Sequence, residues 1–130
     1  MKKSIWASAA AILIGATYFI GFQPRAMAQS VDGVAIELSE LALAGQELYN
    51  DTCADCHGVD LNGTDKGPGF LNGIYAAGHH SDMAFILAVR MGTRAHHWRF
   101  GPMPPQDGFT NEQIGEIITY IRELQAANGF

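Results

Sequence analysis

The stretch Cys53-Ala54-Asp55-Cys56-His57 (CADCH) contains both cysteines of the chain, and its chemistry constrains the fold that can surround it. Two cysteines separated by two residues can form a disulfide, bind zinc, exchange disulfides or attach a prosthetic group covalently. Because each of these roles needs different surroundings, the flanking sequence can distinguish between them.

Three of the four roles lack the context that they need. A thioredoxin-like C-x-x-C requires a βαβ unit, and the sequence predicts no strands. A structural zinc site needs four ligands, so a distant histidine would have to join those of CADCH. A disulfide across two residues closes a very small loop and stabilises little. The remaining interpretation is covalent haem attachment, in which Cys53 and Cys56 form thioethers and His57 binds the iron.

The N-terminus predicts export. Met1-Lys2-Lys3 is basic, residues 5–22 form an uncharged and mostly apolar run, and Ala26-Met27-Ala28 is an A-x-A pattern. This is the layout of a secretory signal peptide, for which we predict cleavage after Ala28. The alternative is an uncleaved membrane anchor, because the apolar run is long for a signal peptide.

Export would leave one acidic domain. We divide the chain into a signal peptide (1–28), a flexible leader (29–38) and a single domain (39–130). Without the signal peptide, five basic residues remain against thirteen acidic ones, a net charge of −8. Such a surface repels nucleic acid and anionic membranes, so we expect no nucleic-acid partner, and membrane contact only if the signal sequence is retained. It favours protein partners with a basic docking patch.

Three helices are predicted within the domain. The first spans residues 39–50 and the second residues 82–91. The third begins at Thr110, which forms a capping box with Gln113. This last helix has an apolar stripe that we assign to core packing, made of Ile114, Ile117, Ile118, Ile121 and Leu124.

The segments between the helices, 58–80 and 93–109, are rich in glycine or proline and predict irregular chain. Loops this long in a compact domain need something to wrap. Three short helices cannot fill the space beneath them, whereas a haem would supply the missing core. The loops therefore support haem attachment independently of CADCH.

A second axial ligand is predicted in the second loop. Met103 lies between two prolines, which stiffen the backbone and suit a loop that presents one side chain to a metal. Methionine opposite histidine is the axial pair of cytochromes c. Met83 and Met91 lie in the second helix, where methionine is more often core filler.

With these pieces the chain resembles class I, monohaem cytochrome c over about residues 39–127. The matching pieces are Gly45 and Tyr49 in the first helix, CADCH, Gly67-Pro68, Met103-Pro104 and Tyr120-Ile121. The resemblance implies an all-α cytochrome c fold, with three main helices and long loops wrapped around one covalently bound haem c. It also implies that the first and last helices cross where Gly45 and Tyr49 meet Tyr120. The 46 residues from His57 to Met103 resemble the compact bacterial type.

The resemblance also implies roles around the haem. The thioethers belong to Cys53 and Cys56, and the axial ligands are His57 and Met103. The carbonyl of Pro68 is expected to accept a hydrogen bond from Nδ1 of His57, which would fix the tautomer and raise the basicity of the ligand. Candidates for a propionate contact are Trp98, Arg94 and Arg99. Apolar candidates to line the haem are Phe70, Leu71, Ile74, Tyr75, Phe85, Leu87, Trp98 and Phe100.

Two vicinal histidine pairs, His79-His80 and His96-His97, depart from the ordinary pattern of this family. The first interpretation is that they are surface loop residues. One of them could instead replace Met103 as the sixth ligand, or the pairs could form a copper or zinc site or a docking patch for a copper protein. The sequence leaves these interpretations open.

The functional hypothesis that follows is a periplasmic electron carrier rather than an enzyme. It would cycle between Fe(II) and Fe(III) and exchange electrons with redox proteins, such as a copper protein or a membrane oxidoreductase. One alternative is a haem subunit of a multisubunit dehydrogenase or oxidase complex. Another is a ligand-binding or catalytic haem protein with an open iron site, against which Met103 argues.

Overall fold

The structure is a computed structural model that describes residues 28–31 and 34–130. The predicted signal peptide lies outside these residues except for Ala28, so its cleavage stays a prediction. Among the residues that the structure describes, no helix combines the length and the apolar character needed to cross a membrane.

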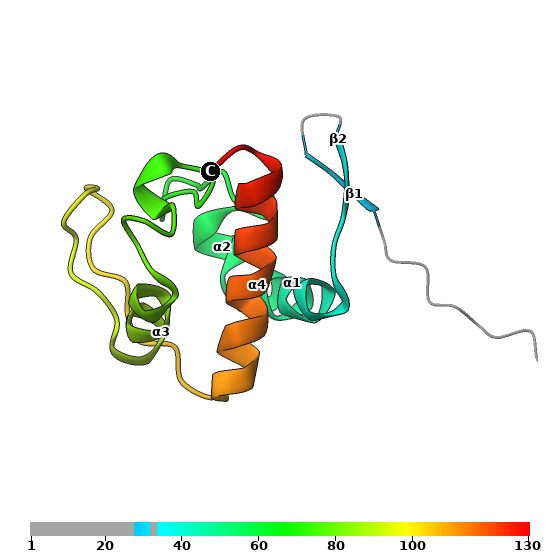
Figure 1. Cartoon of the computed structure of the whole chain (residues 1–130). Helices are drawn as coiled ribbons and strands as arrows, with labels where there is room; N and C mark the ends of the chain where they lie inside the picture. The colour runs from blue at the N-terminus through cyan, green and yellow to red at the C-terminus, as the bar shows by residue number, and fades with distance from the viewer. Residues whose placement is uncertain (1–27, 32–33) are drawn as a thin grey trace, which may run out of the picture.

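The described chain is mostly helical. Its elements are β1 (Ala28–Val31), β2 (Val34–Glu37), α1 (Glu40–Thr52), α2 (Ala54–His57), a 3-10 helix η1 (Gly73–Tyr75), α3 (Asp82–Met91) and α4 (Asn111–Ala127). Figure 1 shows α1 and α4 crossing in the middle of the molecule, with α3 and the long loops on one side and the hairpin on the other. The predicted all-α cytochrome c architecture is confirmed.

The helix boundaries follow the local signals in the sequence. The side chain of Ser39 accepts a hydrogen bond from the backbone amide of Ala42 at the start of α1. Thr110 and Gln113 form both halves of the predicted capping box at the start of α4. Gly92 ends α3 with a φ of 70°, which favours glycine.

The prediction of no strands is wrong at the N-terminal edge of the domain. Strands β1 and β2 pair antiparallel, with Ala28 opposite Glu37 and Val31 opposite Val34, in the stretch expected to be a flexible leader. The sequence between the strands is Asp32-Gly33, a dipeptide common in two-residue hairpin turns. This local turn signal, rather than periodicity, identifies the hairpin.

The end of β2 and the residues that follow it join the core. Ile36 and Leu38 are buried and belong to the same cluster as the apolar face of α4. Ser39 donates from both its backbone amide and its hydroxyl to the carboxylate of Glu123 on α4, at 2.9 and 2.6 Å. These contacts tie the start of α1 to the end of the chain.

The crossing of α1 and α4 depends on a residue without a side chain. A Cβ atom at Gly45 would collide with the carbonyl oxygen of Glu116, so the two backbones touch directly. One turn further along α1, the fully buried ring of Tyr49 lies 5.4 Å from that of Tyr120. The hydroxyl of Tyr49 donates to the carbonyl of Gly58 across 2.8 Å. The predicted contact of Gly45 and Tyr49 with Tyr120 is thus confirmed.

Helix α3 does not bury its methionines. Met83 is 58% exposed, so the interpretation of Met83 as core filler is wrong, whereas Met91 lies in the wall of a cavity described below. The only residue of α3 in the buried core is Phe85. The helix is short and packs on α4 through one side, so apolar residues on its other sides remain accessible.

We predict that Gly45→Ala lowers the free energy of unfolding by about 2–3 kcal/mol, because the added methyl group forces α1 and α4 apart. Gly115→Ala is the matched control, since a Cβ there meets nothing within 4 Å. That variant should raise stability by about 0.5–1 kcal/mol through helix propensity. Urea unfolding of the haem-loaded variants measures both. Equal effects of the two substitutions would contradict a close helix crossing.

Candidate haem site

The motif CADCH forms a single helical turn that continues α1. The amide of Cys53 donates to the carbonyl of Tyr49 at 2.7 Å, and the amide of His57 donates to the carbonyl of Cys53 at 2.9 Å. Residues three and four apart in such a turn share one face, which brings Cys53, Cys56 and His57 together. No disulfide joins the two cysteines, so both sulfur atoms remain available for other bonds.

The imidazole of His57 is fixed by two contacts. Its Nδ1 donates to the carbonyl oxygen of Pro68 across 2.8 Å, the hydrogen bond implied by the family resemblance. The ring of Phe70 stacks on it, with ring centres 4.4 Å apart and planes 23° from parallel. With Nδ1 protonated, Nε2 keeps a free lone pair that can bind a metal.

Burial keeps this imidazole neutral. His57 is only 8% exposed, and its pKa lies below the ordinary value because burial disfavours the charged ring. The hydrogen bond to Pro68 opposes this shift, since it favours a protonated Nδ1. The result is a neutral ligand whose orientation is set by the backbone.

The Gly67-Pro68 loop is held close against CADCH. The hydroxyl of Thr64 donates to the carbonyl of Cys56 at 2.7 Å, and an isolated bridge pairs Gly63 with Pro68. A Cβ at Gly67 would lie 2.9 Å from the carbonyl oxygen of Cys56, so only glycine allows this approach. These contacts place the Pro68 carbonyl within reach of His57.

A cavity of about 440 Å³ opens beside His57. Its walls come from CADCH, the 68–80 loop, α3, the 92–103 loop and the apolar face of α4. All the aromatic and aliphatic side chains proposed to line a haem lie in its wall except Leu71 and Ile74. Leu87, Met91 and Phe100 are large apolar side chains that are exposed and belong to this wall.

Met103 lies in the wall of the same cavity. Its backbone forms a two-way bridge with Thr93, with N···O distances of 2.9 and 3.0 Å. The bridge closes the loop between them into a hairpin-like turn. A Cβ at Gly92 would lie 2.5 Å from the carbonyl oxygen of Met103, so this end of the loop is also closely packed. Met103 therefore sits on a braced segment rather than a free loop.

The three candidates for a propionate contact lie in different places. The indole nitrogen of Trp98 donates to the hydroxyl of Tyr75 at 3.1 Å, so its hydrogen bond is already used within the protein. Arg94 is exposed and belongs to the cavity wall, whereas Arg99 is exposed and does not line it. Contact of any of them with a propionate stays a prediction.

The geometry agrees with a comparison to known families. The chain matches the family model of cytochrome c over residues 42–125, more than half of its length. The chain belongs to the cytochrome c family. A comparison with curated proteins finds no match. Membership implies a covalently bound haem c, and a chain of 130 residues has the size for one haem.

The residues of the cavity fit this cofactor. The wall is largely apolar, as a porphyrin face requires, and Cys53 lies in it next to His57. Cys56 lies at the edge of the same helical turn, half-buried. Two thiols and an unprotonated imidazole nitrogen in one turn are the donor set that haem c attachment needs. The site therefore suits the cofactor of the family.

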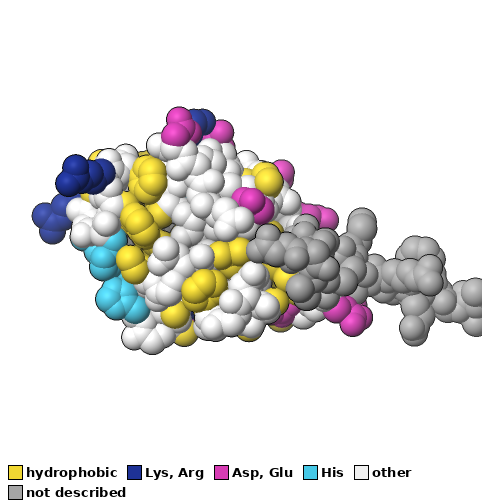
Figure 2. Space-filling model, turned by 90° about the horizontal axis from the view of Figure 1, so that it is seen from above, with side chains coloured by type: hydrophobic (Ala, Val, Ile, Leu, Met, Phe, Trp, Pro, Cys, Tyr) yellow, Lys and Arg dark blue, Asp and Glu magenta, His cyan; other side chains and the backbone are white. Residues whose placement is uncertain are grey.

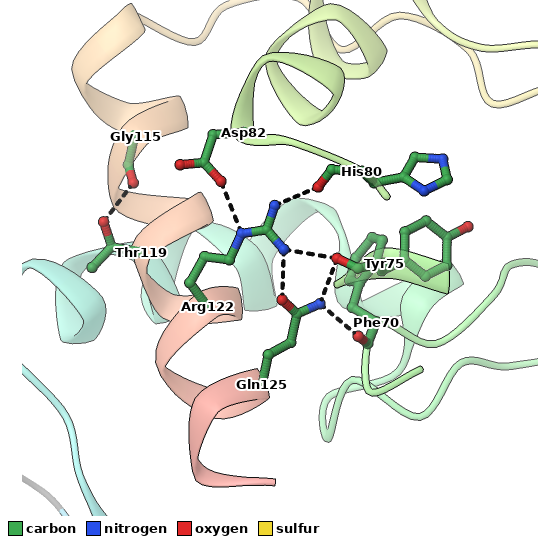
Figure 3. A network of polar contacts seen from close by, with 8 residues as sticks. All are labelled: Phe70, Tyr75, His80, Asp82, Gly115, Thr119, Arg122 and Gln125. Atoms are coloured by element: carbon green, nitrogen blue, oxygen red, sulfur yellow. Dashed lines mark hydrogen bonds and ion pairs between the residues drawn. The ribbon is translucent and has the colours of Figure 1, made fainter. Parts of the chain in front are cut away.

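One functional element of the cavity was not predicted from the sequence. Arg122, on α4, donates to the carbonyls of Tyr75 and His80 at 2.7 and 2.5 Å, and forms an ion pair with Asp82 at 2.8 Å. Gln125 donates to the carbonyls of Phe70 and Tyr75 and accepts from Arg122. Figure 3 shows these groups converging on the loop that forms one wall of the cavity.

This network positions the cavity wall through its backbone carbonyls. Such carbonyls have no sequence pattern, because any residue supplies one. The only sequence sign is an arginine and a glutamine three residues apart on α4. The role of Arg122 thus depends on contacts with residues far away in the sequence, which no local pattern indicates.

We predict that Arg122→Met lowers the free energy of unfolding by about 3 kcal/mol. The substitution removes a largely buried guanidinium and leaves the carbonyls of Tyr75 and His80 without their hydrogen-bond donor. Asp82→Ala is the control: its carboxylate is 63% exposed, and losing this single partner should cost less than about 1 kcal/mol. Urea unfolding of haem-loaded protein measures both. A loss for Asp82→Ala as large as that for Arg122→Met would contradict the central role of the carbonyl contacts.

Proposed function

We propose that this cytochrome is a periplasmic electron carrier whose haem iron has His57 and Met103 as axial ligands. The observation that supports it most is that the two side chains belong to the wall of one cavity but come from separately braced segments. His57 is held by Pro68, and Met103 by Thr93. Two ligands supplied in this way can remain in place in both oxidation states.

When bound, haem c supplies the Fe(II)/Fe(III) couple. The chain supplies ligands, burial and orientation. Nδ1 of His57 keeps its proton and donates a hydrogen bond to the Pro68 carbonyl, which increases the electron-donating strength of Nε2. The largely apolar wall disfavours ordered water around a bound haem, which favours a small rearrangement on electron transfer.

A methionine at the sixth position argues for a carrier rather than a catalyst. Reactions of gases or peroxides at haem require an open coordination position. Met103 on a braced loop would fill that position permanently. On this proposal, electrons leave and enter at the edge of the haem through transient contact with redox proteins.

The acidic residues that give the exported chain its net charge do not line the haem cavity. The cavity wall contains Arg94 and no aspartate or glutamate, although the exported chain would be strongly acidic. We propose that the acidic residues orient a basic partner at long range, while the contact at the cavity itself is apolar. Raising the ionic strength should therefore slow association more than it alters the bound complex.

Carbon monoxide tests the ligand assignment. We predict that the spectrum of the reduced wild-type protein does not change under carbon monoxide, because Met103 occupies the sixth position. Met103→Ala should open that position, and its reduced spectrum should shift as carbon monoxide binds.

Met91→Ala is the matched control, since Met91 lies in the same cavity wall on α3. It should behave like the wild type. An immediate shift in the wild-type spectrum would contradict the carrier proposal and favour an open-site haem protein. A spectral shift in Met91→Ala but not in Met103→Ala would show that Met91, and not Met103, is the sixth ligand.

A further inference from the structure

The two histidine pairs come together in space. His79 and His80 precede α3 and His96 and His97 follow it, so the helix brings its two flanking loops side by side. The rings of His79 and His97 have centres 5.2 Å apart, and those of His80 and His97 are 5.3 Å apart. Figure 2 shows histidine side chains exposed at one end of the molecule, beside hydrophobic and basic ones.

Three of these histidines have the geometry of a metal site. His79, His80 and His97 each offer one ring nitrogen, and these three atoms lie within 4.8 Å of one another. Nε2 of His79 and Nε2 of His97 are 3.3 Å apart. Two nitrogens bound to one tetrahedral zinc ion at about 2.0–2.1 Å are separated by roughly 3.3 Å. This pair therefore already has the spacing of a tetrahedral edge.

The third imidazole is oriented by the backbone. Nδ1 of His80 donates to the carbonyl of Ile74 across 2.7 Å, which leaves Nε2 as the nitrogen with a free lone pair. Histidines that bind metals usually donate their other ring nitrogen to a carbonyl or carboxylate in this way. The carbonyl of His80 is itself held by Arg122. The fold thus fixes both the position and the tautomer of this ring.

The donor set favours a transition metal. The cluster contains imidazole nitrogens and no carboxylate, which suits zinc or copper and not calcium or magnesium. Three protein nitrogens leave a fourth position for water or for another ligand. The rings of His79 and His97 are exposed, so an ion can reach them from solvent.

We propose that His79, His80 and His97 form a binding site for a divalent transition-metal ion, with Zn²⁺ the best match to the tetrahedral spacing. The site uses neither of the proposed axial ligands, although His80 and His97 also line the haem cavity, and it does not depend on the proposed electron-carrier role. A bound ion joins the loop before α3 to the loop that contains Met103. It therefore stabilises two walls of the haem cavity against opening.

Calorimetric titration of ZnCl₂ into haem-loaded protein, purified without a histidine tag, tests the proposal. With haem attached, Cys53 and Cys56 are used in thioethers and cannot bind the added ion. We expect one zinc ion per chain and a rise in the melting temperature. His79→Ala and His97→Ala should each weaken the affinity at least about tenfold, since even indirect partners of metal ligands affect affinity by that factor.

His96→Ala is the matched control. This histidine is exposed in the same loop, but it is not among the three with convergent nitrogens, and its Nδ1 lies 2.8 Å from the carbonyl of Arg94. It should keep the wild-type affinity within about twofold, and an unchanged far-UV circular dichroism spectrum would show that each variant is folded. No binding at zinc concentrations on the order of 100 μM, or binding unaffected by both His79→Ala and His97→Ala, would overturn the proposal.

Discussion

The hydrogen bond from Nδ1 of His57 to the carbonyl of Pro68 joins the two parts of the structure on which the cavity depends. One part is the helical turn of CADCH, which α1 presents. The other is the glycine-rich loop, which passes so close to that turn that Gly67 has no room for a side chain. Because the imidazole is held in this way, this residue of the cavity wall keeps a fixed tautomer with the lone pair on Nε2.

The position of CADCH depends in turn on the contact between α1 and α4. Gly45 lets the two backbones touch, and Tyr49 extends the contact to Tyr120 and, through its hydroxyl, to Gly58. Gly58 directly follows the attachment motif. The last helix therefore supports the attachment motif through Tyr120, and it holds the loop before α3 through Arg122. One helix at the end of the chain thus supports two walls that are distant in sequence.

Features with a local physical cause could be predicted from the sequence. The caps at Ser39 and Thr110 and the end of α3 at Gly92 each need only a few neighbouring residues. The attachment motif is equally local, because thioether formation and iron binding dictate its spacing. The long loops were predicted from their glycine and proline content, and the need to fill the space beneath them pointed to the haem.

Features that depend on tertiary contacts were not predicted. The network of Arg122 acts on backbone carbonyls, and the exposure of Met83 depends on how little of α3 packs against α4. The hairpin did have a sequence sign in Asp32-Gly33, but its strands are too short to show alternation. The meeting of the histidine pairs depends on α3 holding its flanking loops together.

We propose that a single cavity supplies both axial ligands of one haem iron. X-ray absorption at the iron edge of the purified, oxidised protein tests it most directly, because sulfur and nitrogen ligands scatter differently. We predict one sulfur and five nitrogens in the first coordination shell: the sulfur of Met103, four porphyrin nitrogens and one nitrogen of His57. A shell with no sulfur, in which another histidine or water takes the sixth position, would contradict it.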